Sequence, residues 1–339
     1  MADLNVRIGS LTLKHPVLPG PGPNVSGVAD ATHAVDGGAA ALVLKTVTLA
    51  PPPGPGLWVA ASAKDGAFHG AAPSTMPFDA WLDGVWRPAV TAARAGRVPL
   101  IPAIGYTADA VVSMAERLPE ADALLYDTHH ASRADLLPAL TALKQVTTAP
   151  VIVRLAPHHG EDLGALAAAL EPHADAFCLI GSFGPTLQLD SEHPEASPGI
   201  GFLSGAPIRP IAQRFVFEVA QQVSKPVIAA GGIFTGRDVV TALMLGASAV
   251  MISTAAVLKG PRIYGEVAGE LAQWLDGNGY ASVDEVQGAY VRKWGHGQRV
   301  VTEKEEAPVL SAADCITCTL CETVCFYDAI KAPPKTLPT

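Results

Sequence analysis

The segment Lys225–Ala255 constrains the fold of this chain more than any other stretch. It reads KPVIAAGGIFTGRDVVTALMLGASAVMISTA. Two short apolar runs, residues 227–230 and 248–252, have the length of buried strands. Between them, residues 237–245 carry apolar side chains at helical spacing, and a glycine follows as a stop signal. The segment therefore predicts a strand, a glycine turn, a helix and a second strand.

Both of these strands end in residues suited to binding an anion. Gly231 and Gly232 follow the first strand, and Ser253 and Thr254 follow the second. A turn without Cβ atoms lets backbone N–H groups approach an anion closely. In a (β/α)₈ barrel, the loops after strands seven and eight commonly bind phosphate. We therefore predict a phosphate site, the alternative being a βαβ unit with a tight turn and no ligand.

The rest of the chain repeats the alternation of strands and helices. Further strands are expected at residues 16–18, 41–45, 99–103, 122–128, 151–155 and 177–181. Further helices are expected at residues 81–93, 108–118, 135–144, 162–170, 211–223 and 263–275. Residues 4–13 predict a short hairpin, and residues 51–77 and 182–200 read as long loops. This pattern indicates an α/β fold of the (β/α)₈ TIM barrel type. A doubly wound sheet would need a nucleotide fingerprint in its first βα turn, and the sequence has none there.

Composition narrows the class of protein further. With 339 residues, 49% hydrophobic and 16% charged, the chain can bury one large barrel plus a small appendage. The net charge of −9, without a block of Lys or Arg, argues against a nucleic-acid or anionic-membrane surface. The apolar run at 242–258 is interrupted by Gly246 and by hydroxyl residues, which favours a helix end plus a strand over a membrane span. No apolar leader is visible at the N-terminus, so we expect a cytoplasmic protein.

Four of the five cysteines lie close together near the C-terminus. Cys315, Cys318, Cys321 and Cys325 give the spacing C-x₂-C-x₂-C-x₃-C, the bacterial ferredoxin pattern for iron–sulfur ligation. We predict a [4Fe–4S] cluster, with zinc as the structural alternative. Because such a fourth cysteine often ligates another cluster, Cys325 either completes this one or a partner supplies the last ligand. The fifth cysteine, Cys178, lies within a predicted strand and is expected to be a buried apolar residue. The predicted organisation is a barrel at 1–290, a linker at 291–312 and a ferredoxin-like segment at 313–339.

The sequence resembles a known enzyme family. Residues 199–255, with GFLSGAPIRPIA upstream of IAAGGI, are similar to the C-terminal half of dihydroorotate and dihydropyrimidine dehydrogenases. A fainter resemblance covers residues 4–290. These enzymes are FMN-dependent barrels, so the resemblance implies bound FMN. It assigns the phosphate to the two strand ends described above. It also places the following residues near the flavin: Gly20, Gly22, Lys45, Thr46, Arg154, Ser204 and Gly205. Arg154 would donate hydrogen bonds to a carbonyl edge of the flavin and stabilise negative charge there. The alternative for Lys45 is an ordinary strand-end lysine, and the alternative for Arg154 is a surface arginine.

The segment YDTHHAS, residues 126–132, holds the predicted acid–base group. Aligned with the family, Asp127 falls at an asparagine and His130 at the catalytic cysteine. Histidine transfers protons well near neutral pH. His129 is the second candidate, since strand alternation predicts that only one of the two faces inward. His69, in FHGAAPS, falls where the family has an asparagine-containing substrate stretch, so it either takes over that contact or is a plain loop histidine. For His129 and His130 the alternative is a loop dipeptide on the surface.

Two departures from the family argue against orotate or uracil as the substrate. The loop after His130 runs almost directly into a helix, so most of the active-site lid is missing. Strand six ends in Gly181-Ser182, where the family has an asparagine.

The resulting functional hypothesis is an FMN-dependent oxidoreductase acting on a C–C bond adjacent to a carbonyl. It would act on a small molecule and exchange electrons through the cluster with a ferredoxin-like carrier or a reductase subunit. We further expect a homodimer or higher oligomer. The alternatives are a dihydroorotate or dihydropyrimidine dehydrogenase subunit, a non-redox phosphate-ligand barrel (a lyase or binding protein) with a structural cluster, and an electron-relay subunit.

Overall fold

The computed structural model describes residues 2–51, 59–61, 64–70, 74–294, 311–325, 329–332, 335 and 337–338. The chain divides into two compact units, Met1–His296 and Gly297–Thr339. The first unit holds the barrel, and the second holds the cysteine-rich segment.

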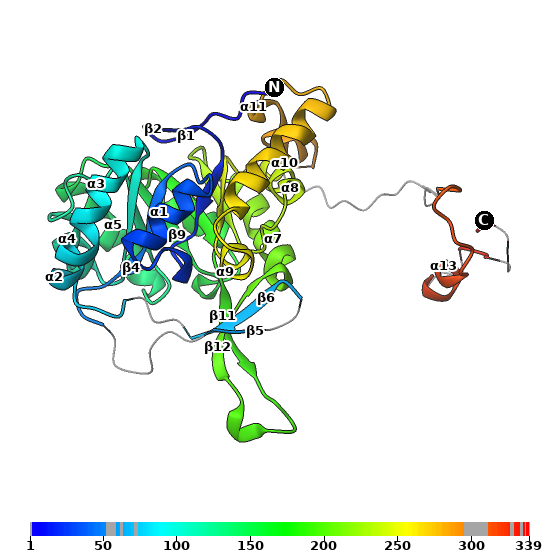
Figure 1. The fold of residues 1–339 in the computed structure, drawn as a ribbon, viewed down its shortest axis with the longest axis horizontal. Coiled ribbons are helices and arrows are strands. Elements are labelled where there is room, and N and C mark those ends of the chain that lie inside the picture. The colour runs from blue at the N-terminus through cyan, green and yellow to red at the C-terminus, as the bar shows by residue number, and fades with distance from the viewer. Residues whose placement is uncertain are drawn as a thin grey trace. The chain divides into compact units, whose positions relative to one another are not determined.

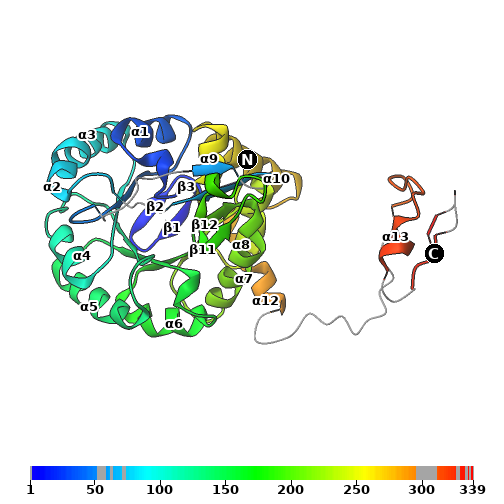
Figure 2. The same ribbon diagram turned by 90° about the horizontal axis from the view of Figure 1, so that it is seen from below.

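Eight parallel strands form the centre of the first unit, and all eight predicted strands are present (Figures 1 and 2). The strands are β3 (Val17–Pro19), β4 (Leu42–Val47), β7 (Leu100–Ile104), β8 (Leu124–Asp127), β9 (Val151–Leu155), β10 (Ala176–Ile180), β13 (Val227–Ala230) and β14 (Ala249–Ile252). Their order in the sheet is β3-β14-β13-β10-β9-β8-β7-β4. The end strands β3 and β4 contact each other, and the Ala40 amide donates to the Val17 carbonyl at 3.0 Å. The sheet thus nearly closes into the predicted (β/α)₈ barrel.

Helices surround the sheet on its outer side, as Figure 2 shows. They are α1 (Val28–Asp36), α2 (Phe78–Trp81), α3 (Arg87–Gly96), α4 (Ala108–Ala115), α5 (Leu136–Val146), α6 (Leu163–Leu170), α7 (Arg209–Ala220), α8 (Gly236–Met244), α9 (Thr254–Lys259), α10 (Ile263–Gly277), α11 (Val283–Val286) and α12 (Ala289–Trp294). A π-helical turn, Leu82–Trp86, joins α2 to α3. The strands read as continuous apolar runs because helices cover one of their faces and barrel side chains the other.

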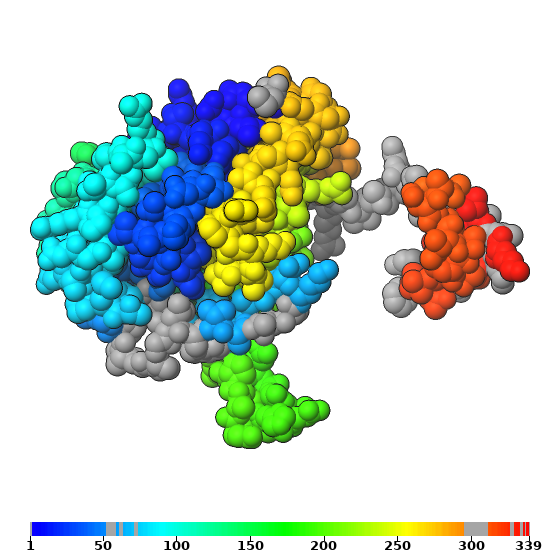
Figure 3. All heavy atoms as spheres, in the orientation of Figure 1, coloured from blue at the N-terminus to red at the C-terminus, as the bar shows by residue number. Residues whose placement is uncertain are grey.

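Two smaller sheets lie outside the barrel. The predicted hairpin is present as β1 (Val6–Ile8) paired with β2 (Leu11–Leu13). A four-stranded sheet has the order β11-β12-β6-β5. Its strands are β5 (Val59–Ala61), β6 (Gly66–His69), β11 (Phe183–Gln188) and β12 (Gly199–Gly205). The β11–β12 hairpin stands away from the barrel in Figures 1 and 3.

The interpretation of residues 51–77 and 182–200 as plain loops was therefore wrong in part. Both stretches contain strands of the four-stranded sheet, although residues 52–58, 62–63 and 71–73 lie outside the described part of the chain. β11 reads FGPTLQ, and its residues are exposed or half-buried. Such a strand lacks a buried apolar face, so the periodicity that reveals core strands is missing.

Residues 242–258 contain the end of α8, strand β14 and most of α9, as expected for a helix end plus a strand. In the described part of the chain, no helix is long and apolar enough to cross a membrane. The second unit contains one short described helix, α13 (Leu320–Val324), within the cysteine-rich segment.

Candidate active site

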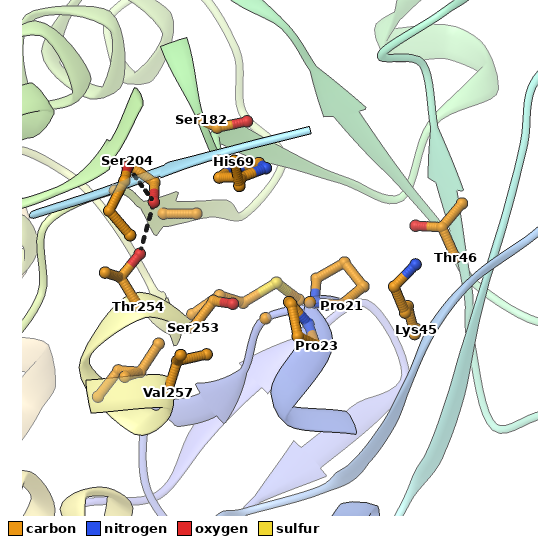
Figure 4. Close-up of a pocket in the computed structure, with 18 of the residues that line it drawn as sticks. Pro21, Pro23, Lys45, Thr46, His69, Ser182, Ser204, Ser253, Thr254 and Val257 are labelled. Atoms are coloured by element: carbon orange, nitrogen blue, oxygen red, sulfur yellow. Dashed lines mark hydrogen bonds between the residues drawn. The ribbon is translucent and has the colours of Figure 1, made fainter. Parts of the chain in front are cut away.

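A single pocket gathers nearly all of the predicted site residues at the carboxyl ends of the barrel strands (Figure 4). The pocket encloses about 1080 Å³ including its open mouth. The predicted residues that line it are Gly20, Gly22, Lys45, Thr46, His69, Asp127, His129, His130, Arg154, Ser204, Gly231, Gly232, Ser253 and Thr254. Gly205 does not line it, but follows Ser204 on β12 and contacts Thr254. Residues far apart in the sequence therefore meet where a barrel places its active site.

One end of the pocket combines glycine backbone with hydroxyl groups. Gly231 and Gly232 follow β13 with φ of 122° and 80°, values that side chains other than glycine's disfavour. A Cβ on Gly232 would lie 2.7 Å from the Cβ of Arg209. Thr254 donates its hydroxyl to Ser204 Oγ at 2.9 Å, shown as a dashed line in Figure 4. The turn after β13 is thus built of backbone, with hydroxyls from two other strand ends beside it.

Arg209 and Asp238 hold this turn from outside the pocket. Arg209 Nε donates to the Gly232 carbonyl at 2.6 Å, and its Nη1 lies 2.9 Å from Asp238 Oδ1. Asp238 Oδ2 accepts the backbone N–H groups of Phe234 and Thr235, each at 2.9 Å. Asp238 also completes the capping box that starts α8. The turn is therefore fixed in its shape before any ligand binds.

The glycine turn after β3 packs directly against the end of β14. A Cβ on Gly22 would collide with Ser253 Oγ, and one on Gly20 would lie 3.2 Å from Ser253 Cβ. Ser253 Oγ donates to Asn24 Oδ1 at 2.7 Å, and Asn24 Nδ2 lies 2.9 Å from the Tyr264 hydroxyl. Packing therefore requires glycine at position 22 and leaves little room for a side chain at position 20 of the GPGPNVSG segment.

A buried ion pair lies at the other side of the pocket. Asp127, at the end of β8, accepts from Thr46 Oγ1 at 2.7 Å and from Arg154 Nη1 at 3.1 Å through the same oxygen. Its other oxygen accepts the backbone N–H of His129 at 3.1 Å. Burial opposes ionisation of Asp127, but the Arg154 guanidinium and the hydrogen bonds from Thr46 and the His129 backbone hold its pKa below the usual range. Asp127 is thus an ionised carboxylate that positions Arg154.

Lys45 and Arg154 bring positive charge to the same region. Burial lowers the pKa of Lys45 to about 8, and the carboxylate of Asp127 opposes this shift. Arg154 Nε is buried and has no hydrogen-bond partner among the described residues. Gly181 lies against the guanidinium, where a Cβ would collide with Nη2. A pocket-lining donor that is left without an acceptor indicates a ligand with an acceptor edge.

Both predicted histidines line the pocket, which corrects the expectation that only one faces inward. β8 ends at Asp127, so His129 and His130 lie in the following turn, where strand alternation no longer applies. His129 is buried and His130 is exposed. His129 Nε2 lies 3.2 Å from Ser182 Oγ. Burial lowers the pKa of His129 to about 3, although Asp127 opposes this effect.

His69 also lines the pocket, from β6. Burial is the main cause that lowers its pKa, with smaller contributions from Arg154 and Lys45. Its ring stacks at 6.1 Å on Phe202, which is its cross-strand partner on β12. The four-stranded sheet therefore supplies one wall of the pocket.

Sequence reasoning missed two residues of this site. Tyr106 lines the pocket, its ring centroid lies 4.7 Å from that of His130 in a T-shaped arrangement, and burial raises the pKa of its hydroxyl. Asn24 positions Ser253 from the short helix after β3. The position of Tyr106, directly after Gly105 at the end of β7, was a usable signal, because barrel strand ends carry site residues. No local pattern marked Asn24.

The geometry of the pocket fits FMN. One end offers a glycine cradle with hydroxyl groups of the kind that surrounds a phosphate. The other side offers Lys45 and the unpartnered Nε of Arg154, donors suited to the polar edge of a flavin ring. Between them the wall is apolar, from Ala230, Met251 and Ile252. Each part of the cofactor thus meets matching chemistry.

The four cysteines predicted as cluster ligands lie in the second unit. Cys315, Cys318, Cys321 and Cys325 are all described, yet no three His, Cys, Asp or Glu side chains of the described residues are grouped to hold a metal. The iron–sulfur assignment therefore stays a prediction.

The fifth cysteine, Cys178, is buried on β10 in the barrel, and its sulfur lies 3.7 Å from Met251 Sδ. Burial raises the pKa of its thiol to about 12.

Comparison with known proteins identifies the family. The family model for dihydroorotate dehydrogenase matches residues 126–275. The chain is 39% identical over 149 residues to a catalytic subunit of dihydroorotate dehydrogenase B (NAD(+)) from Geobacter sulfurreducens, covering 44% of this chain and 48% of the relative. A subunit of the same name from Pyrococcus furiosus is 36% identical over 148 residues, covering 43% and 49%.

These two matches span about half the length of the relatives. A third relative of the same name, from Desulforudis audaxviator, is 30% identical over 316 residues, covering 86% of this chain and 98% of the relative. The chain therefore belongs to the dihydroorotate dehydrogenase family.

Proposed function

We propose that this protein is an FMN-dependent oxidoreductase acting on a C–C bond adjacent to a carbonyl group. The observation that carries the proposal is the composition of the pocket at the carboxyl ends of the barrel strands. A glycine and hydroxyl cradle at one end and the Lys45–Arg154–Asp127 cluster at the other suit the two ends of one FMN molecule. The chemistry that FMN supplies when bound is the acceptance or donation of a hydride.

The residues of the chain would have distinct tasks. Gly231, Gly232, Ser253 and Thr254 bind the phosphate. Lys45 and Arg154 bind the polar edge of the ring, and Asp127 holds Arg154 in place through the 3.1 Å contact. His130, exposed at the mouth, exchanges the substrate proton with solvent. His69 and Phe202 bound the space for the substrate.

Dihydroorotate is the first substrate to test, because the relatives are named for it. This chain departs from the family pattern at the substrate side of the pocket, where Ser182 and three histidines line the wall. A related carbonyl compound with a different ring is therefore the alternative within the same reaction class. Turnover of dihydroorotate by the purified protein, followed through flavin reduction, decides between them.

Binding of FMN compared with riboflavin tests the proposal directly. The two ligands differ only in the phosphate, so Ser253→Ala and Thr254→Ala should weaken FMN binding and leave riboflavin binding unchanged. Hydrogen bonds to a charged group contribute about 1.5–3 kcal/mol, so each variant should lose about tenfold to a hundredfold in FMN affinity. Thr241→Ala is a matched control, since Thr241 Oγ1 bonds within α8 to the Arg237 carbonyl.

Absence of any flavin affinity would reject the redox function and favour a lyase or a phosphate-ligand binding protein. FMN binding without turnover of any carbonyl substrate, but with electron transfer to a carrier, would favour a relay subunit.

The second part of the proposal concerns electron exchange. The cysteine spacing supports one [4Fe–4S] cluster per chain, which would pass single electrons to a ferredoxin-like carrier or a reductase subunit. The relatives are named as catalytic subunits, which is consistent with such a partner.

Iron and sulfide analysis after anaerobic purification tests the cluster. Cys321→Ala should abolish the iron content, whereas Cys178→Ala should retain it, because Cys178 is buried in the barrel. Equal iron content in both variants would refute the assignment.

A further inference from the structure

Three polar residues from two strand ends form a chain of contacts beside the pocket. Asp127 ends β8, His129 lies two residues later, and Ser182 lies two residues after the end of β10. His129 Nδ1 is 4.0 Å from Asp127 Oδ1, and His129 Nε2 is 3.2 Å from Ser182 Oγ. All three residues line the pocket, and Figure 4 shows Ser182 at its wall. The order is carboxylate, imidazole, hydroxyl.

The surroundings of His129 favour one tautomer. Its Nδ1 is buried and has no hydrogen-bond partner among the described residues, and the nearest charged oxygen is that of the ionised Asp127. A lone pair facing a carboxylate is repelled, whereas an N–H group is attracted, so Nδ1 carries the proton. Nε2 is then free to accept the hydroxyl proton of Ser182. The same division of roles makes a serine reactive in serine hydrolases.

The imidazole is also fixed in its orientation. The Phe202 ring lies 5.4 Å from the His129 ring, and the His158 ring lies 6.0 Å from it. The backbone N–H of His129 donates to Asp127 Oδ1 at 3.1 Å, which anchors the turn to the carboxylate. The imidazole is thus confined on two sides, and a hydrogen bond holds its backbone, so its ring has the fixed position that acid–base catalysis requires.

We propose that Asp127, His129 and Ser182 form a proton relay that makes the Ser182 hydroxyl a reactive group facing the bound molecule. When Ser182 Oγ forms a bond to an electrophile or to a proton, its own proton passes to His129 Nε2. The O–H electron pair stays on Oγ, and the imidazolium N–H faces Asp127. Nε2 of the Nδ1-protonated imidazole carries the lone pair that accepts this proton, and the carboxylate of Asp127 opposes the effect of burial on the His129 pKa.

The relay adds a residue to the proposed function, and only its role in that reaction rests on the proposed function. In an oxidoreductase of the proposed kind, Ser182 is a second group beside His130 that can take the proton from the substrate carbon. The reactivity of Ser182 itself needs no flavin.

Diisopropyl fluorophosphate provides the test. Attack by Ser182 forms the O–P bond and breaks the P–F bond, fluoride leaves, and the hydroxyl proton goes to His129. Mass spectrometry of the purified protein, as isolated and after flavin removal, should locate the adduct on Ser182. His129→Gln should lower the labelling rate by about 10²-fold, the lower end of what a positioned proton acceptor contributes.

The controls separate the relay from folding and from the proposed function. Ser224→Ala should label at the wild-type rate, because Ser224 contacts Glu171 at the opposite end of the barrel. Circular dichroism checks that His129→Gln is folded. An unlabelled Ser182 in both preparations, or an unchanged rate in a folded His129→Gln protein, overturns the relay. Labelling in a protein that binds no flavin supports the relay and rejects the proposed function, whereas bound FMN without labelling does the reverse.

Discussion

Replacing Asp127 by asparagine isolates the electrostatic role of this carboxylate. In the wild type one carboxylate oxygen accepts from Thr46 and Arg154, and the other accepts from the His129 backbone. An asparagine side chain has one acceptor oxygen and one amide group. In either orientation, the amide group therefore faces a donor.

The structure sets the expected magnitude. Asp127 is 3% exposed, and the side chain of Arg154 is 15% exposed. Removing one partner of a buried pair leaves an uncompensated charge and costs about 3–5 kcal/mol. Because Arg154 is not fully buried, we expect Asp127→Asn to lower the free energy of unfolding by about 3 kcal/mol at pH 7.

The effect should depend on pH with a definite sign. The folded pKa of Asp127 is below the reference value of 3.8, so the stabilisation is present above pH 3.8 and is lost as pH falls through the folded pKa. The difference between wild type and Asp127→Asn should therefore be largest near neutral pH and should shrink below about pH 4.

Urea unfolding without added FMN measures this difference, because bound ligand would add its own stabilisation. The double variant Asp127→Asn/Arg154→Met removes the stranded charge and should recover at least half of the loss. A loss below about 1 kcal/mol for Asp127→Asn, the size of a surface ion pair, would refute the argument. A double variant no more stable than the single variant would refute it as well.

Four further predictions concern single residues. Gly181→Ala should reduce FMN affinity about tenfold, a loss of about 1.4 kcal/mol, because a Cβ would displace the Arg154 guanidinium. Gly199→Ala is the control, since Gly199 also has a positive φ but has open space around it. Equal effects of the two changes on FMN affinity would contradict the reasoning. The rate of acetylation of Lys45, measured by mass spectrometry as a function of pH, should have its midpoint near pH 8 instead of 10.5, and bound FMN should slow the reaction. A midpoint near pH 10.5 would show that Lys45 is not buried as described. A thiol reagent should modify the four tail cysteines of the metal-free native protein and reach Cys178 only on unfolding, since burial raises its pKa to about 12; rapid reaction of a fifth thiol would disprove this. His130→Ala should slow substrate-dependent flavin reduction by about 10²–10⁴-fold at unchanged flavin content; His193→Ala on the exposed hairpin is the control, and wild-type single-turnover rates in His130→Ala would assign the proton elsewhere.

The sequence alone predicted the barrel because its strands are buried on both faces. Continuous apolar runs such as Ala176–Ile180 remain recognisable without knowledge of their neighbours. The four-stranded sheet was missed because β11 has no buried face and because β12 pairs with β6, which is distant in the sequence. Local patterns carry no information on such pairing.

The same distinction applies to the site. Gly231 and Gly232 were predictable because a tight turn at a strand end leaves a local signature. The contact between His129 and Ser182 joins residues separated by 53 positions, and no periodicity reports it. Likewise, Asp127 was expected at a family position, whereas its ion pair with Arg154 depends on the neighbouring register of β8 and β9.

The four-stranded sheet forms one wall of the pocket, and residues of this wall are selected for substrate entry and not for flavin retention. Most of the residues assigned to the cofactor follow strands of the barrel, whereas His69 and Phe202 belong to β6 and β12. Ser204 and Gly205 are the exceptions, since both lie on β12, and Ser204 accepts a hydrogen bond from Thr254. Substitutions on β6 and β12 before Ser204 can therefore reshape which molecules enter, while flavin retention stays under a separate constraint. A new substrate preference can arise in this fold through the appended sheet alone, without a compensating change in the barrel.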